Sequence, residues 1–188
     1  MQTRCTGFWH SAPDLAPDEM LLSLAHAQHK KNFDLWHQED MARDPAASDS
    51  VIATVKRNID KLNQQRNDLI EKLDEQLQRE LLARGVPPVP EAPFNSETPG
   101  SIIDRLSILS LKIFHMREQA ERTDAAPAHL ERCRQRLEVL TRQREDLAHA
   151  LSSLLDELGA GQKQLKLYRQ FKMYNDPESN PEIYKRKA

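Results

Sequence analysis

Residues 130–158 read "LERCRQRLEVLTRQREDLAHALSSLLDEL", and this stretch decides the fold class. Apolar side chains recur in it every three or four residues, at Leu130, Cys133, Leu137, Leu140, Leu147, Leu151, Leu154 and Leu158. That spacing puts them on one face of a helix with 3.6 residues per turn. Arg144 stands where the stripe expects an apolar residue. A helix with a single apolar stripe has to bury it against other helices, so the stretch predicts a helical bundle.

Residues 50–84 carry a similar stripe at Ile59, Leu62, Leu69 and Leu73, with Arg66 in the gap. The segment "LNQQRNDL" at 62–69 matches "LTRQREDL" at 140–147 at five of its eight positions. An arginine on an apolar stripe must reach water or find an acceptor, because an unpaired buried charge is very costly. Two alternatives stay open: pairing with acids inside the bundle, or a shared clamp for a ligand carboxylate or phosphate.

Capping residues and prolines divide the rest of the chain. We expect long helices over 17–43, 50–84, 98–122 and 127–158, and a short helical element over 162–174. Four prolines within seven residues make 85–97 a loop. The predicted fold is all-α: an antiparallel bundle of four long helices plus a short C-terminal helix. Residues 1–188 form a single domain in this prediction, with 1–15 and 176–188 flexible.

Composition limits the function. The net charge of −2 gives no global field that would favour nucleic acid. No stretch approaches the roughly 20 apolar residues of a membrane span, and the first residues lack the apolar core of a signal peptide. Cys5 and Cys133 are too few for a disulfide framework or a zinc module. We therefore expect a cytoplasmic protein that neither inserts into membranes nor binds nucleic acid.

Candidate site residues lie on the polar helix faces. His37 and Asp40 are one turn apart and suit an oriented acid/base pair, while two ligands alone do not fill a metal site. In 98–122, polar side chains are mixed with aliphatic ones, which suggests that this face is covered by a helix, a second subunit or a ligand. The candidates for catalysis are His37, Asp40, Asp104 and His115. The candidates for ligand binding are Arg66, Arg144, Asn63, Thr98, Gly100, Ser101 and Lys112.

The start of the 98–122 helix suits an anion. Thr98-Pro99-Gly100 leaves backbone N–H groups free at a helix N-terminus, and the glycine permits close approach. The nucleotide-binding and hydrolase motifs Gly-Lys-Ser/Thr, Gly-x-Gly-x-x-Gly, His-Glu-x-x-His and Gly-x-Ser-x-Gly do not occur in the sequence.

Four segments carry a family resemblance: "NFDLWHQEDMAR" (32–43), "KRNIDKLNQQRNDLIEKLD" (56–74), "SETPGSIIDRLSILSLKIFHM" (96–116) and "YRQFKMYNDP" (168–177). In these the chain resembles a bacterial family catalogued as domain of unknown function 4254. The resemblance implies an all-helical bacterial protein associated with genes for cell-envelope glycan assembly and glycosyltransferases. It implies no catalytic residue.

Three functions remain open from the sequence. The first is a polar site for an anionic small molecule, such as an activated sugar, with or without catalysis. The second is a non-catalytic accessory protein of a glycosyltransferase. The third is a metal-dependent hydrolase that uses Glu39, Asp40, Asp60, Glu71 or Asp74. The sequence names no cofactor and predicts no bound metal; the expected partners are an anionic small molecule, another protein or a second copy.

Overall fold

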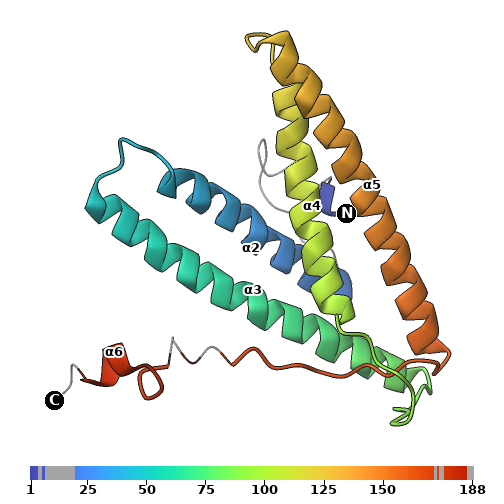
Figure 1. The fold of residues 1–188 in the computed structure, drawn as a ribbon. Helices are drawn as coiled ribbons and strands as arrows, with labels where there is room; N and C mark the ends of the chain where they lie inside the picture. The colour runs from blue at the N-terminus through green and yellow to red at the C-terminus, as the bar shows by residue number, and fades with distance from the viewer. Residues whose placement is uncertain (4–5, 7–19, 172, 174–175, 186–188) are drawn as a thin grey trace.

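The computed structural model describes residues 1–3, 6, 20–171, 173 and 176–185, and this part of the chain is helical without strands. Its long helices are α2 (Met20–Ala42), α3 (Asp49–Ala83), α4 (Pro99–Ala120) and α5 (Pro127–Gly159), and a short α6 (Pro181–Tyr184) follows (Figure 1). The predicted all-α fold with four long helices is confirmed, and the short C-terminal helix is α6, which lies after the segment 162–174 where it was predicted. The predicted start of the first helix, at residue 17, lies outside the described residues. No helix in the described part is long and apolar enough to cross a membrane.

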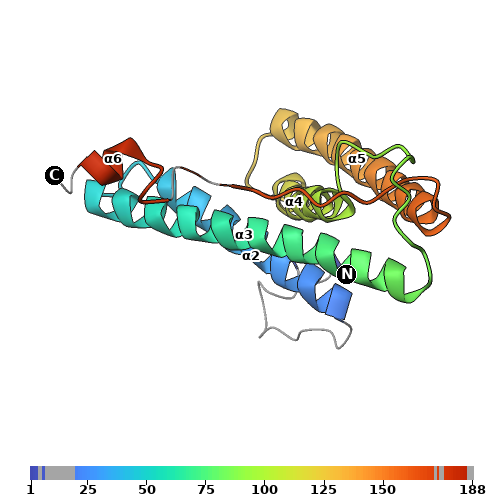
Figure 2. The ribbon, with the colours of Figure 1, turned by 90° about the horizontal axis from the view of Figure 1, so that it is seen from below.

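The long helices form two antiparallel hairpins. Helix α2 pairs with α3, and α4 pairs with α5, while α4 also contacts both α2 and α3. Figures 1 and 2 show that the α4–α5 hairpin lies across the α2–α3 hairpin and diverges from it, so the bundle is splayed. Helix α4 is therefore the element through which the two hairpins meet.

The buried apolar residues form two clusters, and α3 contributes to both, since its Leu77 and Leu81 also pack against the α4–α5 cluster. Leu35, Val55 and Ile59 are buried between α2 and α3. Between α4 and α5 the buried residues are Ile102, Leu106, Leu154 and Leu158. Five other leucines of α5 are only half-buried: Leu130, Leu137, Leu140, Leu147 and Leu151. Because α5 packs mainly on α4, the middle of its apolar stripe stays partly open.

The start of α4 follows the sequence prediction. Thr98 is the N-cap, its side chain accepts a hydrogen bond from the N–H of Ser101 at 3.2 Å, and Pro99 takes the first helical turn. Such a cap satisfies one of the N–H groups that a helix leaves without a partner in its first turn.

The element predicted over 162–174 is not a helix: the described residues 162–171 begin with a bend and continue as irregular chain. The Gln164 backbone N–H donates to the carbonyl of Pro93 at 3.0 Å, and the Gln164 side chain donates to the carbonyls of Pro90 and Ala92. Arg169 then pairs with Glu71 of α3 at 3.0 Å. These tertiary contacts override the local helical preference of the segment.

Gly100 sits where α4 starts against α3. Its backbone N–H donates to the Asp74 carboxylate at 2.7 Å. A Cβ atom on Gly100 would lie 2.7 Å from the carbonyl oxygen of Ile70 and 2.9 Å from the Asp74 carboxylate. Only glycine lets the two helices approach this closely.

We expect Gly100→Ala to destabilise the protein by about 1–3 kcal/mol, because the added methyl group overlaps a backbone oxygen that cannot move aside cheaply. Urea unfolding measures the change. Gly159→Ala is the matched control, since no atom lies within 4 Å of a Cβ built there. A Gly100→Ala protein as stable as the control variant would contradict the close contact.

Candidate functional site

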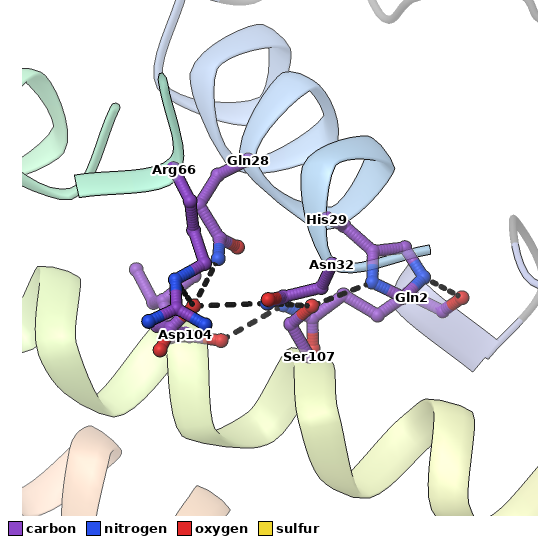
Figure 3. Close-up of polar contacts among 8 residues, drawn as sticks. Gln2, Gln28, His29, Asn32, Arg66, Asp104 and Ser107 are labelled. Carbon is purple, nitrogen blue, oxygen red and sulfur yellow. Dashed lines mark hydrogen bonds and ion pairs between the residues drawn. The ribbon is translucent and has the colours of Figure 1, made fainter. Parts of the chain in front are cut away.

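A buried carboxylate lies where the two hairpins meet. Asp104 of α4 accepts hydrogen bonds from the side-chain amides of Gln28 and of Asn32, the latter at 2.9 Å. Arg66 of α3 adds an ion pair, with Nε 3.7 Å from Oδ1 of Asp104 (Figure 3). Asp104 thereby links α4 to both helices of the other hairpin.

The polar contacts continue along α2 from Asn32. Its amide also donates to Oγ of Ser107 at 2.8 Å, and Ser107 lies 2.7 Å from Nδ1 of His29. On the other side of the ring, Nε2 of His29 lies 2.9 Å from the backbone carbonyl of Gln2 and 2.9 Å from the hydroxyl of Thr6, which itself donates to that carbonyl at 3.0 Å. A carbonyl only accepts, so Nε2 carries the proton and Nδ1 accepts from the Ser107 hydroxyl.

His29 is fully buried, and this changes its acid–base behaviour. Burial lowers the pKa of His29 to about 4, although the hydrogen bond to Gln2 works in the opposite direction. A charged imidazole would lose its hydration, and His26 and the N-terminal amine lower the pKa further. His29 is therefore neutral near pH 7.

The predicted clamp residues have different surroundings. Arg66 forms an ion pair with the buried Asp104, as the first of the two alternatives expects, and its buried Nε makes no hydrogen bond among the described residues. Arg144 of α5 is half-buried, and its Nε makes no hydrogen bond within the described part of the chain. Asn63 lies one turn before Arg66 on α3 and is half-buried. A shared anion site for the two arginines stays a prediction.

The start of α4 already holds an anionic side chain of the protein. Besides the hydrogen bond to Gly100, Asp74 receives one from the side chain of Thr98, and Ser101 contacts Thr98 through its hydroxyl at 3.0 Å. Burial raises the pKa of Asp74, Glu71 adds to the rise, and the bonds from Thr98 and Gly100 oppose it. The N–H groups that the sequence offers to a ligand thus face a carboxylate of α3.

A second polar region is a groove of about 970 Å³ between the end of α2 and the α4–α5 hairpin. We call it the cationic groove; its charged and aromatic walls are Trp36, Asp40, Lys112, His115, Arg132 and Arg136. Met116, Val139 and Leu140 line it as well. It brings together three of the predicted site residues, namely Asp40, Lys112 and His115.

The cations of the groove take part in none of the ion pairs among the described residues. Lys112, Arg132 and Arg136 are exposed, and among the described residues no carboxylate forms an ion pair with any of them. Three positive side chains therefore face one lining carboxylate, that of Asp40. Such an excess of positive charge favours an anion in the groove.

The imidazole of His115 forms part of a fixed aromatic wall. Its ring stacks on the indole of Trp36 with centroids 4.6 Å apart and an interplanar angle of 13°. Nδ1 lies 2.8 Å from the Glu118 carboxylate, and Nε2 is buried. His37 and Asp40 are 3.9 Å apart, beyond hydrogen-bonding distance. The carboxylate that contacts His115 is therefore that of Glu118. Asp104 lies in the buried junction instead.

Metal ligands are not grouped in the described residues: no set of three or more His, Cys, Asp or Glu side chains lies close enough together to hold an ion. The carboxylates named for a hydrolase have other contacts. Glu71 pairs with Arg169, Asp60 with Lys56 and Asp74 with Gly100.

Sequence reasoning missed most of the junction and half of the groove. Gln28, Asn32 and Ser107 were not singled out, because a polar residue in a helix normally faces water. Their 3–4 spacing was the available signal: Gln28 and Asn32 are four residues apart, and Asp104 and Ser107 are three apart. Arg132 and Arg136 show the same spacing on α5, beside the leucine stripe, whose Leu140 lines the same groove.

Two helical hairpins joined through a buried carboxylate, with a cationic groove beside the junction, define an all-helical bundle protein. The family model described as "Protein of unknown function (DUF4254)" matches residues 22–167, so the chain belongs to that family. No curated protein and no solved structure matches the chain. The family description names no activity, and the site itself must support any function.

We expect Asp104→Ala to destabilise the protein by about 2–4 kcal/mol, because it leaves the buried amides of Gln28 and Asn32 and the charge of Arg66 without their acceptor. Thermal and urea unfolding measure the loss. Asp60→Ala is the control: its pair with Lys56 is an exposed i,i+4 contact, for which we expect less than about 1 kcal/mol. Equal losses in the two variants would contradict the role of the junction.

We expect stability to fall as pH is lowered from 6.5 to 4, in part through His29. Its native pKa of about 4 lies below the ordinary 6.5, so the unfolded chain binds more protons in this window. The residue contributes a slope of up to about 1.4 kcal/mol per pH unit. Urea unfolding of His29→Gln should show a shallower slope, while the exposed His149→Gln should match the parent. Parallel curves for the parent and His29→Gln would refute this.

Proposed function

We propose that this protein binds an anionic small molecule, carrying phosphate or carboxylate groups, in the cationic groove. The observation that carries the proposal is the set of three cations, Lys112, Arg132 and Arg136, that line one groove without carboxylate partners among the described residues. Arginine and lysine without internal partners are the usual ligands of phosphate oxygens in proteins.

The placement of the cations supports a bound ligand over a merely solvated surface. Arg132 and Arg136 lie one turn apart on α5, and Lys112 reaches the same groove from α4. Like charges that converge in this way repel one another, and an anion between them relieves the repulsion. Apolar side chains, Met116, Val139 and Leu140, line the groove as well, and an apolar surrounding strengthens the attraction between charges.

Binding is better supported than catalysis. His115 has Nδ1 on Glu118 and Nε2 buried, so neither nitrogen is offered to a ligand in the groove. A general base must reach the proton that it abstracts. The catalytic roles of His37, Asp40, Asp104 and His115 remain hypotheses, and a link to activated-sugar or envelope-glycan metabolism rests on the ligand that the groove takes.

The two other functions have less support. A metal-dependent hydrolase needs a set of clustered ligands, and its candidate carboxylates make separate ion pairs and hydrogen bonds. An accessory protein of a glycosyltransferase becomes the preferred alternative if the groove takes no anion.

We expect pyrophosphate to bind the purified protein, and Arg136→Gln to weaken binding about tenfold or more, because one charge-assisted contact is lost. Isothermal titration calorimetry at low salt measures both affinities, and citrate tests carboxylate ligands in the same way. The matched control is Arg134→Gln, which removes an equal charge from the same helix but from an arginine paired with Glu131 outside the groove. Equal losses in the two variants, or no binding of either anion to the parent, would contradict the proposal.

A further inference from the structure

The indole of Trp36 forms a wall of the cationic groove, and its position is set by neighbours on α4. The ring of His115 covers one face of it in a parallel stack. That imidazole itself contacts the Glu118 carboxylate and makes a T-shaped contact with the Phe114 ring, whose centroid is 5.3 Å away. The indole is therefore oriented before any ligand enters, and a ligand gains its stacking energy without first ordering the wall.

A rigid aromatic wall next to unpaired cations has a specific chemical use. A planar heterocycle stacks on an indole, while phosphate oxygens bind lysine and arginine. In this groove Trp36 supplies the first kind of contact, and Lys112, Arg132 and Arg136 supply the second. A bare phosphate would use only the cations and leave the aromatic wall without a role.

The remaining polar lining fits the part of such a ligand that joins ring and phosphate. The groove is also lined by Gln119, Gln135 and Gln143, together with the carboxylate of Asp40. Each amide both donates and accepts hydrogen bonds, and a carboxylate accepts from hydroxyl groups. This combination suits sugar hydroxyls and the edges of a nucleobase.

The size of the groove agrees with a nucleotide. Its volume of about 970 Å³ lies at the upper end of the roughly 300–1,000 Å³ typical of small-molecule sites. Pyrophosphate alone would fill a small part of that volume. A polymer of nucleotides is less suitable, since the chain as a whole has a net charge of −2 and therefore no overall positive field.

We propose that the groove binds a nucleoside diphosphate, with the base stacked on Trp36 and the diphosphate held by Lys112, Arg132 and Arg136. This assignment rests on the anion-binding function proposed above and names its ligand class. The same contacts would hold the nucleoside diphosphate part of a larger ligand.

The test uses the full chain with Trp9→Phe, so that Trp36 is its remaining tryptophan. Its fluorescence is titrated with each common nucleoside diphosphate, and calorimetry gives the affinity for pyrophosphate. We expect at least one nucleoside diphosphate to quench Trp36 and to bind about tenfold or more tightly than pyrophosphate. The corresponding nucleoside without phosphate should bind far more weakly than the diphosphate.

Two variants assign the gain to the indole. By calorimetry, Trp36→Leu should lower the nucleoside diphosphate affinity to that of pyrophosphate while it leaves pyrophosphate binding unchanged. Trp36→Phe, which keeps a stacking ring, should retain most of the gain and serves if the leucine variant does not fold by circular dichroism. A gain that persists in Trp36→Leu would overturn stacking on Trp36.

The remaining outcomes separate the two proposals. Pyrophosphate binding without any gain from a base would overturn the nucleotide assignment and leave the anion site standing. No binding of pyrophosphate or of any nucleoside diphosphate would overturn both. A decanucleotide that binds more tightly than the mononucleotide and quenches Trp36 would show a nucleic-acid strand in the groove and overturn the small-molecule ligand.

Discussion

The arrangement of the two hairpins depends on the carboxylate of Asp104. It is buried on α4, and it takes hydrogen bonds from two amides of α2 and an ion pair from α3. A buried carboxylate needs such donors, because water no longer solvates it. Apolar side chains would pack in many orientations, whereas these donors meet one oxygen in a single arrangement. The junction therefore specifies how α4 lies on the α2–α3 hairpin.

The position of this junction along α4 explains the groove. Asp104 and Ser107 lie in the first half of the helix, so α2 and α3 hold that half and the hairpins diverge beyond it (Figure 1). The second half, with Lys112 and His115, lies beside the end of α2, where His115 stacks on Trp36, and α5 supplies the other wall of the groove. The polar junction at the start of α4 therefore leaves room for the cationic groove at its end. The half-buried stripe of α5 is a further consequence of the divergence.

Local sequence patterns predicted the structural features that depend on residues close together in the sequence. The leucine spacing of 130–158 predicted α5, and Thr98 with Pro99 predicted the start of α4. Arg66 was identified as a stripe residue in need of an acceptor, but only packing could show that the acceptor is Asp104 of another helix. The same limit applies to the cationic groove, whose walls come from three helices. The prediction of a helix over 162–174 was wrong for a related reason. Backbone carbonyls of the loop at 90–93 accept hydrogen bonds from Gln164, and no local pattern reveals these distant acceptors.

A double-mutant cycle on Arg66 and Asp104 tests the central claim most directly. Arg66→Met keeps much of the side-chain volume, and Asp104→Asn keeps an acceptor for the amides of Gln28 and Asn32 while it removes the charge. Urea unfolding of the parent, both single variants and the double variant at pH 7 gives the coupling free energy. The account predicts that the pair is coupled by about 1 kcal/mol or more across the junction. Additive losses, within about 0.3 kcal/mol, would contradict the claim that this ion pair ties α4 to α3.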